Sequence, residues 1–410
     1  MRQTRFPRRG ERWNTYLLYV LAGLTALSQG SMELTFPLNL HHLGSALPLI
    51  GAAVALMGAG QILTRLPAGQ WYRAESAPLF NAAFLVSHGL TTIGLALTPL
   101  WPLQASLAGL HGAAFGFATT YQLAMLIDIR EREGTMAGSI AWYTAAISLG
   151  YAAGSPLGAW AIDRFGYGGA FGISGAVAIG AAALSLLATR PRPRAAPAAM
   201  PLRGWRGLTR GLAGLPAPIW LAALLALYLN FMTDSVASFF PIYALAIGIS
   251  LGFVGVLRGL NSLVGAAIRL AAVGIFRFAR AEPANHVSVI AMAAAAFALS
   301  LVTGPAALVV SFLIFGASRG VLRITSATFV ADERSRLGGG VGLASAVYNA
   351  GLDAGAMLAP PVTGLIAGAA GIPVAFRAVS VGLPLLYYLA WAVVRRRPRG
   401  AAAQAQRPDG

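Results

Sequence analysis

Apolar segments of about 20 residues recur from one end of the chain to the other and limit the folds available to it. They cover residues 15–37, 48–69, 78–98, 102–127, 136–162, 169–189, 218–241, 250–273, 286–303, 306–329, 340–368 and 372–394. A helix of this length crosses the hydrocarbon core of a bilayer and satisfies its own backbone hydrogen bonds there. We therefore predict an all-α polytopic membrane protein with twelve transmembrane helices.

The composition excludes a soluble enzyme. Of the 410 residues, 57% are hydrophobic and 10% are charged, whereas soluble domains average about 25% charged residues. The chain has no cysteine for disulfides or thiol catalysis, and no Walker loop that would indicate ATP as an energy source. A Gly-x-Ser-x-Gly pattern at 316–320 lies inside an apolar segment with no strand before it, so it does not predict a nucleophile. We expect no enzymatic activity, no cofactor and no metal site.

Arginine supplies all 30 basic residues, against 13 acidic ones, and the formal net charge is +17. Such a surplus is compatible with nucleic-acid binding, but these arginines gather in the tails, the central linker and short loops on one side of the predicted helices. Basic residues in short loops mark the cytoplasmic side of a membrane protein. We therefore expect a multi-pass protein of the plasma (inner) membrane with both termini cytoplasmic, in contact with lipid and not with nucleic acid.

The two halves of the chain repeat each other at a shift of 204 residues, without a gap. The shift superposes Phe36 and Pro37 on Phe240 and Pro241, Gly44 on Gly248, Arg65 on Arg269, Arg73 on Arg277, Asp128 on Asp332, and Pro156 on Pro360. Such self-similarity indicates a duplicated structural unit. We predict an N-terminal tail over 1–14, a six-helix bundle over 15–189, a cytoplasmic linker over 190–217, a second six-helix bundle over 218–394, and a C-terminal tail over 395–410.

Three motifs in the first half carry a family resemblance. They are the stretch RLPAGQWYR at 65–73, the stretch from Asp128 to Gly138, and GYAAGSPLG at 150–158 followed by DRFGY at 163–167. With the parallel repeat of six helices, the chain resembles the major facilitator superfamily. The resemblance implies a secondary active transporter that works by alternating access. It also implies a small-molecule substrate and a coupling ion such as the proton.

The motifs also depart from the family pattern. Arg73 stands where the family usually has an aspartate, Ala74 replaces the following basic residue, and Ala108 replaces an arginine. These departures argue against carrying over the proton-antiport machinery of the family. Charged residues at repeat-related positions remain candidates for a cytoplasmic gate: Arg65, Arg73, Asp128, Arg269, Arg277 and Asp332.

Polar side chains inside the apolar segments require an explanation, because a charge at the bilayer centre costs about 2.5 to 3.5 kcal/mol on insertion scales. Four pairs are spaced i, i+4 and so share a helix face: Gln29 with Glu33, Asn230 with Asp234, Arg319 with Arg323, and Asn349 with Asp353. The carboxyl groups of Glu33, Asp234 and Asp353 are candidates for proton coupling, since burial favours the neutral form of a carboxyl group. The alternative is a hydrated or ion-paired carboxylate, with Asp353 paired to Arg258 or Arg319.

The remaining polar residues of the spans are candidates for the substrate cavity: Gln29, His111, Asn230, Arg258, Asn261, Arg319, Arg323 and Asn349. Aromatic residues in the same helices (Tyr16, Tyr121, Phe231 and Phe239) favour proton-coupled export of small amphiphilic or organic compounds by a monomer. Arg258 and Arg319 support an alternative, proton-coupled uptake of an organic anion or other metabolite, because guanidinium binds carboxylate and phosphate. The degenerate loop at Arg73 leaves a third hypothesis, a transport-inactive membrane receptor or assembly partner.

Overall fold

The computed structural model describes residues 9–130, 136–188, 212, 215–275, 281–332 and 341–396. Within these ranges the chain forms eleven helical elements and no strand. The first half forms α1 (Arg9–His42), α2 (Leu47–Trp71), α3 (Ala77–Leu95), α4 (Trp101–Arg130) and α5 (Met136–Leu187). The second half forms α7 (Ala217–Ala246), α8 (Leu251–Ile275), α9 (Ala281–Ala298), α10 (Pro305–Asp332), α12 (Val341–Ala370) and α13 (Ile372–Arg396).

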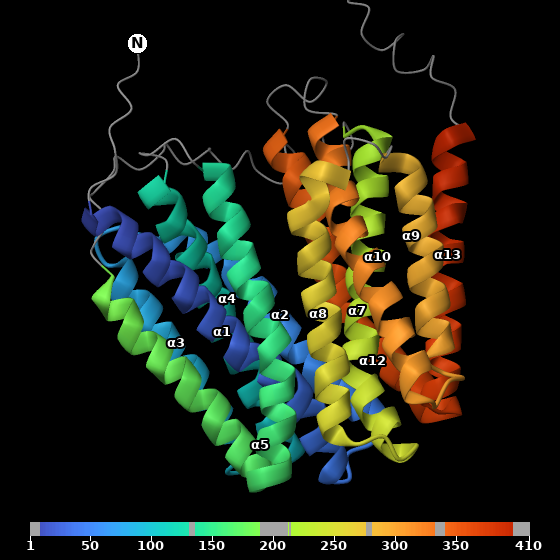
Figure 1. Cartoon of the computed structure of the whole chain (residues 1–410), viewed down its shortest axis with the longest axis horizontal. Coiled ribbons are helices and arrows are strands. Elements are labelled where there is room, and N and C mark those ends of the chain that lie inside the picture. Colours follow the sequence, from blue (N-terminus) through green and yellow to red (C-terminus); the bar gives the residue numbers. More distant parts are fainter. Residues whose placement is uncertain are drawn as a thin grey trace, which may run out of the picture.

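The 52-residue element α5 contains two of the predicted transmembrane segments, 136–162 and 169–189. Its two arms meet at Gly166, whose φ of 68° and ψ of −177° are not helical. Glycine adopts such a positive φ without the steric cost that a side chain would add. Figure 1 shows one arm running to the lower end of the molecule and the other running back. The eleven elements therefore cover all twelve predicted segments.

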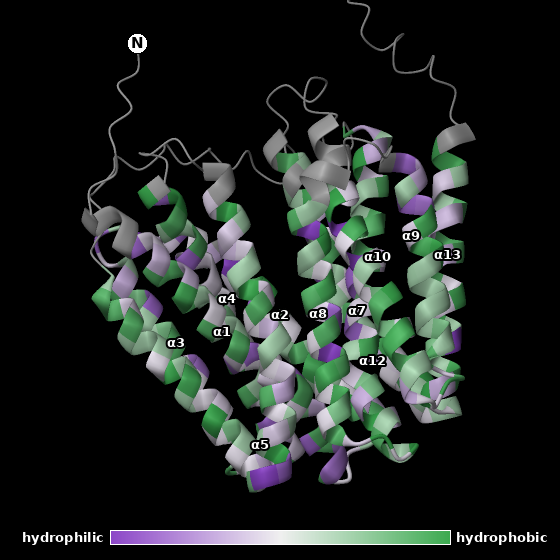
Figure 2. Cartoon of the chain, viewed as in Figure 1, coloured by the Kyte–Doolittle hydropathy of each residue, from purple (hydrophilic) through white to green (hydrophobic). Residues whose placement is uncertain are grey.

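The fold class is confirmed as an all-α membrane protein. Eight of the described helices are long and apolar enough to cross a membrane. Figure 2 shows hydrophobic residues over most of the helical length, with hydrophilic residues interspersed in the middle of the molecule and at its ends. An apolar exterior suits lipid, and buried polar groups inside a bundle mark functional positions.

The helices pack as two groups that correspond to the two halves of the sequence. In the first group α1 and α3 pack on α5, and α2 packs on α4; in the second, α7 packs on α12, and α10 packs on α8 and α9. Contacts between the groups run mainly through two seams, α2 against α12 and α5 against α8, with α1 touching α7 between them. In Figure 1 the two groups converge towards the lower end of the view.

The two ends of the molecule differ in how closely the groups meet. We call the end with the turns at Gly44 and Gly248 the distal end, and the end where α1 begins and α13 ends the proximal end (Figure 1). Towards the distal end a Cβ atom on Gly51 of α2 would meet the Pro360 carbonyl of α12. A Cβ atom on Gly255 of α8 would lie 3.0 Å from the Ser155 carbonyl oxygen of α5. Both seams are therefore in backbone contact near the distal end.

Candidate functional site

A cavity of about 280 Å³ lies between the two helix groups. Its walls come from α1, α2 and α5 of the first half and from α7, α8, α10 and α12 of the second. The charged lining consists of three carboxylates and five guanidinium groups: Glu33, Asp234, Asp353, Arg65, Arg258, Arg269, Arg319 and Arg323. With all eight ionised, the lining carries two more positive than negative charges.

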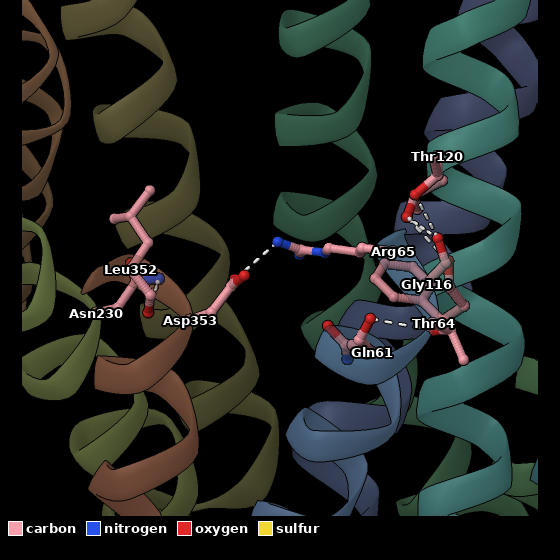
Figure 3. A network of polar contacts seen from close by, with 10 residues as sticks. Gln61, Thr64, Arg65, Gly116, Thr120, Asn230, Leu352 and Asp353 are labelled. Atoms are coloured by element: carbon pink, nitrogen blue, oxygen red, sulfur yellow. Dashed lines mark hydrogen bonds and ion pairs between the residues drawn. The ribbon is translucent and has the colours of Figure 1, made fainter. Parts of the chain in front are cut away.

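Helical periodicity brings these residues to the cavity. On α10 the lining residues Phe312, Phe315, Arg319 and Arg323 recur at three- and four-residue steps, which places them on one face of the helix. The i, i+4 pair of Asn230 and Asp234 on α7 lines the cavity in the same way. The Asn230 side-chain amide also donates to the Leu352 carbonyl of α12 at 2.9 Å, and Figure 3 shows this contact.

Glu33 of α1 lies at the end of a chain of buried polar groups. Its Oε1 accepts a hydrogen bond from Gln29 Nε2 at 3.2 Å. Gln29 Oε1 lies 2.9 Å from His111 Nε2 of α4, and the other ring nitrogen of His111 lies 3.0 Å from the Thr92 hydroxyl of α3. Because a carboxylate only accepts, the Gln29 amide faces Glu33 with its nitrogen, and His111 Nε2 then carries the hydrogen.

A second buried imidazole completes this chain. The ring of His88 packs on that of His111 with centroids 4.1 Å apart, and His88 Nε2 lies 3.3 Å from the Ser28 hydroxyl. Gln29 and His111, which we predicted to line the cavity, instead lie behind it and reach it through Glu33. These two residues therefore support the position of Glu33 and do not form part of the cavity wall.

Arg258 of α8 closes the cavity on the side of α1 and α7. Its Nη1 donates to the backbone carbonyls of Glu33 at 3.2 Å and of Ala237 at 3.0 Å, and its Nη2 lies 3.7 Å from Glu33 Oε2. The residue is only 9% exposed. Its ion-pair partner is thus Glu33 of the other half and not Asp353.

Asp353 of α12 accepts a hydrogen bond from Arg65 Nη1 of α2 at 2.7 Å, and Figure 3 shows this ion pair spanning two helices. The predicted pairing of Asp353 with Arg258 or Arg319 is therefore wrong. Asp353 faces the seam between α2 and α12, where Arg65 approaches from the opposite half. The repeat-related Arg269 of α8 bridges the other seam, since its Nη2 donates to the Ser148 hydroxyl of α5 at 2.6 Å.

Three ionisable groups of the cavity are left for a ligand. Among the residues that the structure describes, Arg319, Arg323 and Asp234 line the cavity and have neither a hydrogen bond nor an ion pair within 4 Å. Asn261, also in the lining, has a buried side-chain oxygen without a hydrogen-bond partner. A cavity with two unpaired guanidinium groups is suited to a negatively charged group.

The other predicted site residues lie elsewhere. Asn349 is exposed and is not part of the lining, and Arg73 is exposed in the turn between α2 and α3. Asp128 accepts a hydrogen bond from the Tyr72 hydroxyl at 2.7 Å. Arg277 and the side chain of Asp332 lie outside the described residues.

The aromatic residues that we expected in the cavity lie elsewhere in the structure. None of the four, Tyr16, Tyr121, Phe231 and Phe239, lines it. Tyr16 is 63% exposed, and the other three are buried among the helices, because a helix presents only some of its aromatic residues to any one neighbour. The aromatic lining instead consists of Tyr151, Phe312 and Phe315.

Polar residues of α2 and α5 line the cavity without having been predicted. Ser148, Tyr151 and Ser155 recur at three- and four-residue steps on α5, and Gln61 precedes Arg65 by one turn on α2. The same face periodicity that identified the charged pairs would have found them. They were missed because uncharged polar residues in a membrane helix carry a weaker signal than charges.

Comparisons with known proteins agree with this architecture. The family model of the Major Facilitator Superfamily matches residues 18–351. The chain is similar to the crystal structure of the nucleoside transporter NupG, with a TM-score of 0.76, 15% identity, and coverage of 94% of this chain and 100% of that one. It is also similar to a bacterial homolog of the human lysosomal transporter Spinster in an inward-facing, unoccupied conformation.

For the Spinster homolog the TM-score is 0.75 at 14% identity, with coverage of 95% of this chain and 98% of that one. Identities this low establish a shared fold alone. Comparison with curated proteins gives no match. The family model nevertheless spans most of the chain, and the duplicated helical halves around a polar cavity are the arrangement expected of such transporters. The chain therefore belongs to the major facilitator superfamily of multi-pass membrane transporters.

Proposed function

We propose that this transporter carries a small organic anion by proton-coupled uptake. The observation that supports this most directly is the pair of arginines, Arg319 and Arg323, that line the cavity without partners. Arg319 is half-buried and Arg323 is exposed, and both belong to the helix α10, which is apolar and long enough to cross a membrane. A cation without a counterion is costly at membrane depth, and a bound carboxylate or phosphate would offset that cost with charge-assisted hydrogen bonds. The polar lining favours this hypothesis over the export of apolar amphiphiles.

Coupling to protons follows from the charge of such a substrate. A membrane potential that is negative inside opposes anion entry by about 2.3 kcal/mol per charge for each 100 mV. Protons taken up with the anion remove that barrier, and Glu33 and Asp234 are the carboxylates of the cavity wall that we propose as their carriers. The arginine-rich tails and linker support an orientation with both termini in the cytoplasm.

Ligand-induced thermal stabilisation of the purified protein tests the substrate class. We expect a panel of carboxylates and phosphates to include compounds that stabilise the protein, by about 2.7 kcal/mol at a hundredfold excess over the Kd. The stabilisation should vanish in Arg319→Gln. It should persist in the control Arg377→Gln, because Arg377 of α13 bonds Ser300 away from the cavity. Stabilisation by unrelated amphiphiles that survives Arg319→Gln would instead support a broad exporter.

Uptake into proteoliposomes tests the coupling and the direction. An inward proton gradient should accelerate uptake of the stabilising anion by the wild-type protein. We expect that acceleration to be lost in Glu33→Gln or Asp234→Asn, while binding measured by thermal shift persists. Unchanged gradient-driven uptake in both variants would exclude them as proton carriers. Binding without any transport would support the receptor hypothesis.

A further inference from the structure

Two helices that face each other across the halves carry a proline at the same position of the repeat. Pro37 lies inside α1 and Pro241 lies inside α7. Proline has no N–H group, so the carbonyl four residues before it lacks its helical hydrogen bond. The carbonyls freed in this way are those of Glu33 and Ala237, which are themselves related by the repeat. A freed carbonyl inside a membrane needs another donor.

A single side chain supplies both hydrogen bonds. Arg258 Nη1 donates to the Glu33 carbonyl at 3.2 Å and to the Ala237 carbonyl at 3.0 Å. These two bonds use both hydrogens of that nitrogen. Arg258 has no equivalent in the first half, because the repeat places Val54 at the corresponding position of α2.

The two bonds have different consequences when the halves move. Ala237 on α7 and Arg258 on α8 belong to the same half, so their bond persists through a relative movement of the halves. Glu33 on α1 belongs to the other half, and its carbonyl and carboxylate both contact the same guanidinium. The Ala237 carbonyl therefore holds Arg258 in place, and the contacts to Glu33 can be made or broken.

The contacts between Arg258 and Glu33 lie on the distal side of the main cavity. A second and smaller cavity of about 90 Å³, which we call the small distal cavity, adjoins the distal seams. Its lining includes Glu33, Pro37, Val54 and Ala237. Gly255, one turn before Arg258 on α8, packs against the backbone of α5 in the other half. Opening the distal end requires α1 to move away from α7 and α8, which breaks the contacts to Glu33.

We propose that Arg258 is a positioning residue that locks the distal end closed by joining the two carbonyls freed by proline. It acts through the Glu33 backbone and carboxylate and does not bind the substrate. This role does not depend on the proposed substrate, because the lock acts in any transport cycle in which the distal end opens. Loss of Arg258 should therefore raise the population of the distal-open state in the absence of any ligand.

Cysteine labelling measures that population, and the chain offers a background without native cysteines. The reporter is Val54→Cys, which lines the small distal cavity, labelled in sealed vesicles by an impermeant maleimide on the distal side only. A cysteine at the exposed Ala46 position in the turn before α2 identifies that side and serves as the reference rate. Arg258→Gln should increase the Val54→Cys rate roughly tenfold, the size expected from hydrogen bonds to a charged group. Arg377→Gln should leave it unchanged.

The proline provides an independent test that leaves the arginine in place. Pro37→Ala restores an N–H group that satisfies the Glu33 carbonyl within α1, so it should also speed labelling, by less than Arg258→Gln does. In the Arg258→Gln background the same change should have no further effect. Pro384→Ala in α13, a proline of a helix that does not line the cavity, is the matched control. Unchanged labelling in Arg258→Gln, or additive effects of the two variants, would overturn the proposal.

Discussion

Gly51 of α2 offers a test of how the distal end closes. A Cβ atom at this position would lie 2.8 Å from the Pro360 carbonyl carbon and 3.0 Å from the Pro361 Cα of α12. These are backbone atoms, so no side-chain rotation can relieve the clash. In Gly51→Ala the two helices must separate, and because they belong to different halves, separation opens the seam between them.

The size of the effect follows from the cost of overpacking, which is about 1 to 3 kcal/mol for an extra methyl group in a close-packed site. This cost applies only to the closed distal end, since the open state removes the contact. The ratio of open to closed molecules should therefore rise by about 5- to 150-fold, at about tenfold per 1.4 kcal/mol. The free energy of unfolding should change far less.

Two other glycines provide controls for this prediction. A Cβ atom on Gly112 of α4 would meet the Met57 backbone of α2, a clash of similar severity within one half. Gly69 has nothing within 4 Å. With a reporter cysteine at Ser238, which lines the small distal cavity, labelling from the distal side should accelerate in Gly51→Ala alone. The unfolding temperature should fall in Gly112→Ala alone. A fall in the unfolding temperature of Gly51→Ala together with unchanged labelling would contradict backbone contact between the halves at this position.

Two further predictions concern the polar contacts. Asp353→Asn removes the ion pair with Arg65, whose two side chains are 46% (Arg65) and 21% (Asp353) exposed. Solvent screening limits the contribution of such a pair to about 1 kcal/mol or less. We therefore expect a small fall in unfolding temperature that disappears at high salt. A large fall that persists at high salt would contradict this. His111→Leu leaves the Gln29 amide oxygen buried without its partner, which should cost about 1 to 3 kcal/mol of unfolding free energy. The control His41→Leu, at an exposed position, should cost almost nothing. Equal unfolding temperatures for the two variants would contradict the buried chain of polar groups.

Much of the fold follows from the hydropathy and the repeat alone. The twelve predicted segments all correspond to helices, because length and apolar content determine what crosses a bilayer. The break in α5 at Gly166 falls in the gap that the hydropathy predicts between the segments 136–162 and 169–189. Which residue of that gap breaks the helix is not predictable from hydropathy, because Gly168 lies in the same gap and stays helical.

The candidate site is also predictable from the sequence only in part. The i, i+4 spacing of Asn230 with Asp234 and of Arg319 with Arg323 predicted a shared helix face, and both pairs lie in the cavity lining. The partner of Asp353 was not predictable on this basis. It depends on which helix of the other half packs against α12, and nothing in the spacing of residues within one helix reports the packing between helices.

The two arginines related by the repeat, Arg65 and Arg269, have acquired chemically different partners on the two seams. Arg65 faces a carboxylate and Arg269 faces a hydroxyl, so one seam has an ion pair and the other has a hydrogen bond from a guanidinium to a neutral group. Salt weakens the first attraction and has little effect on the second. High salt should therefore loosen the seam between α2 and α12 more than the seam between α5 and α8, so the contact between the two halves weakens unevenly.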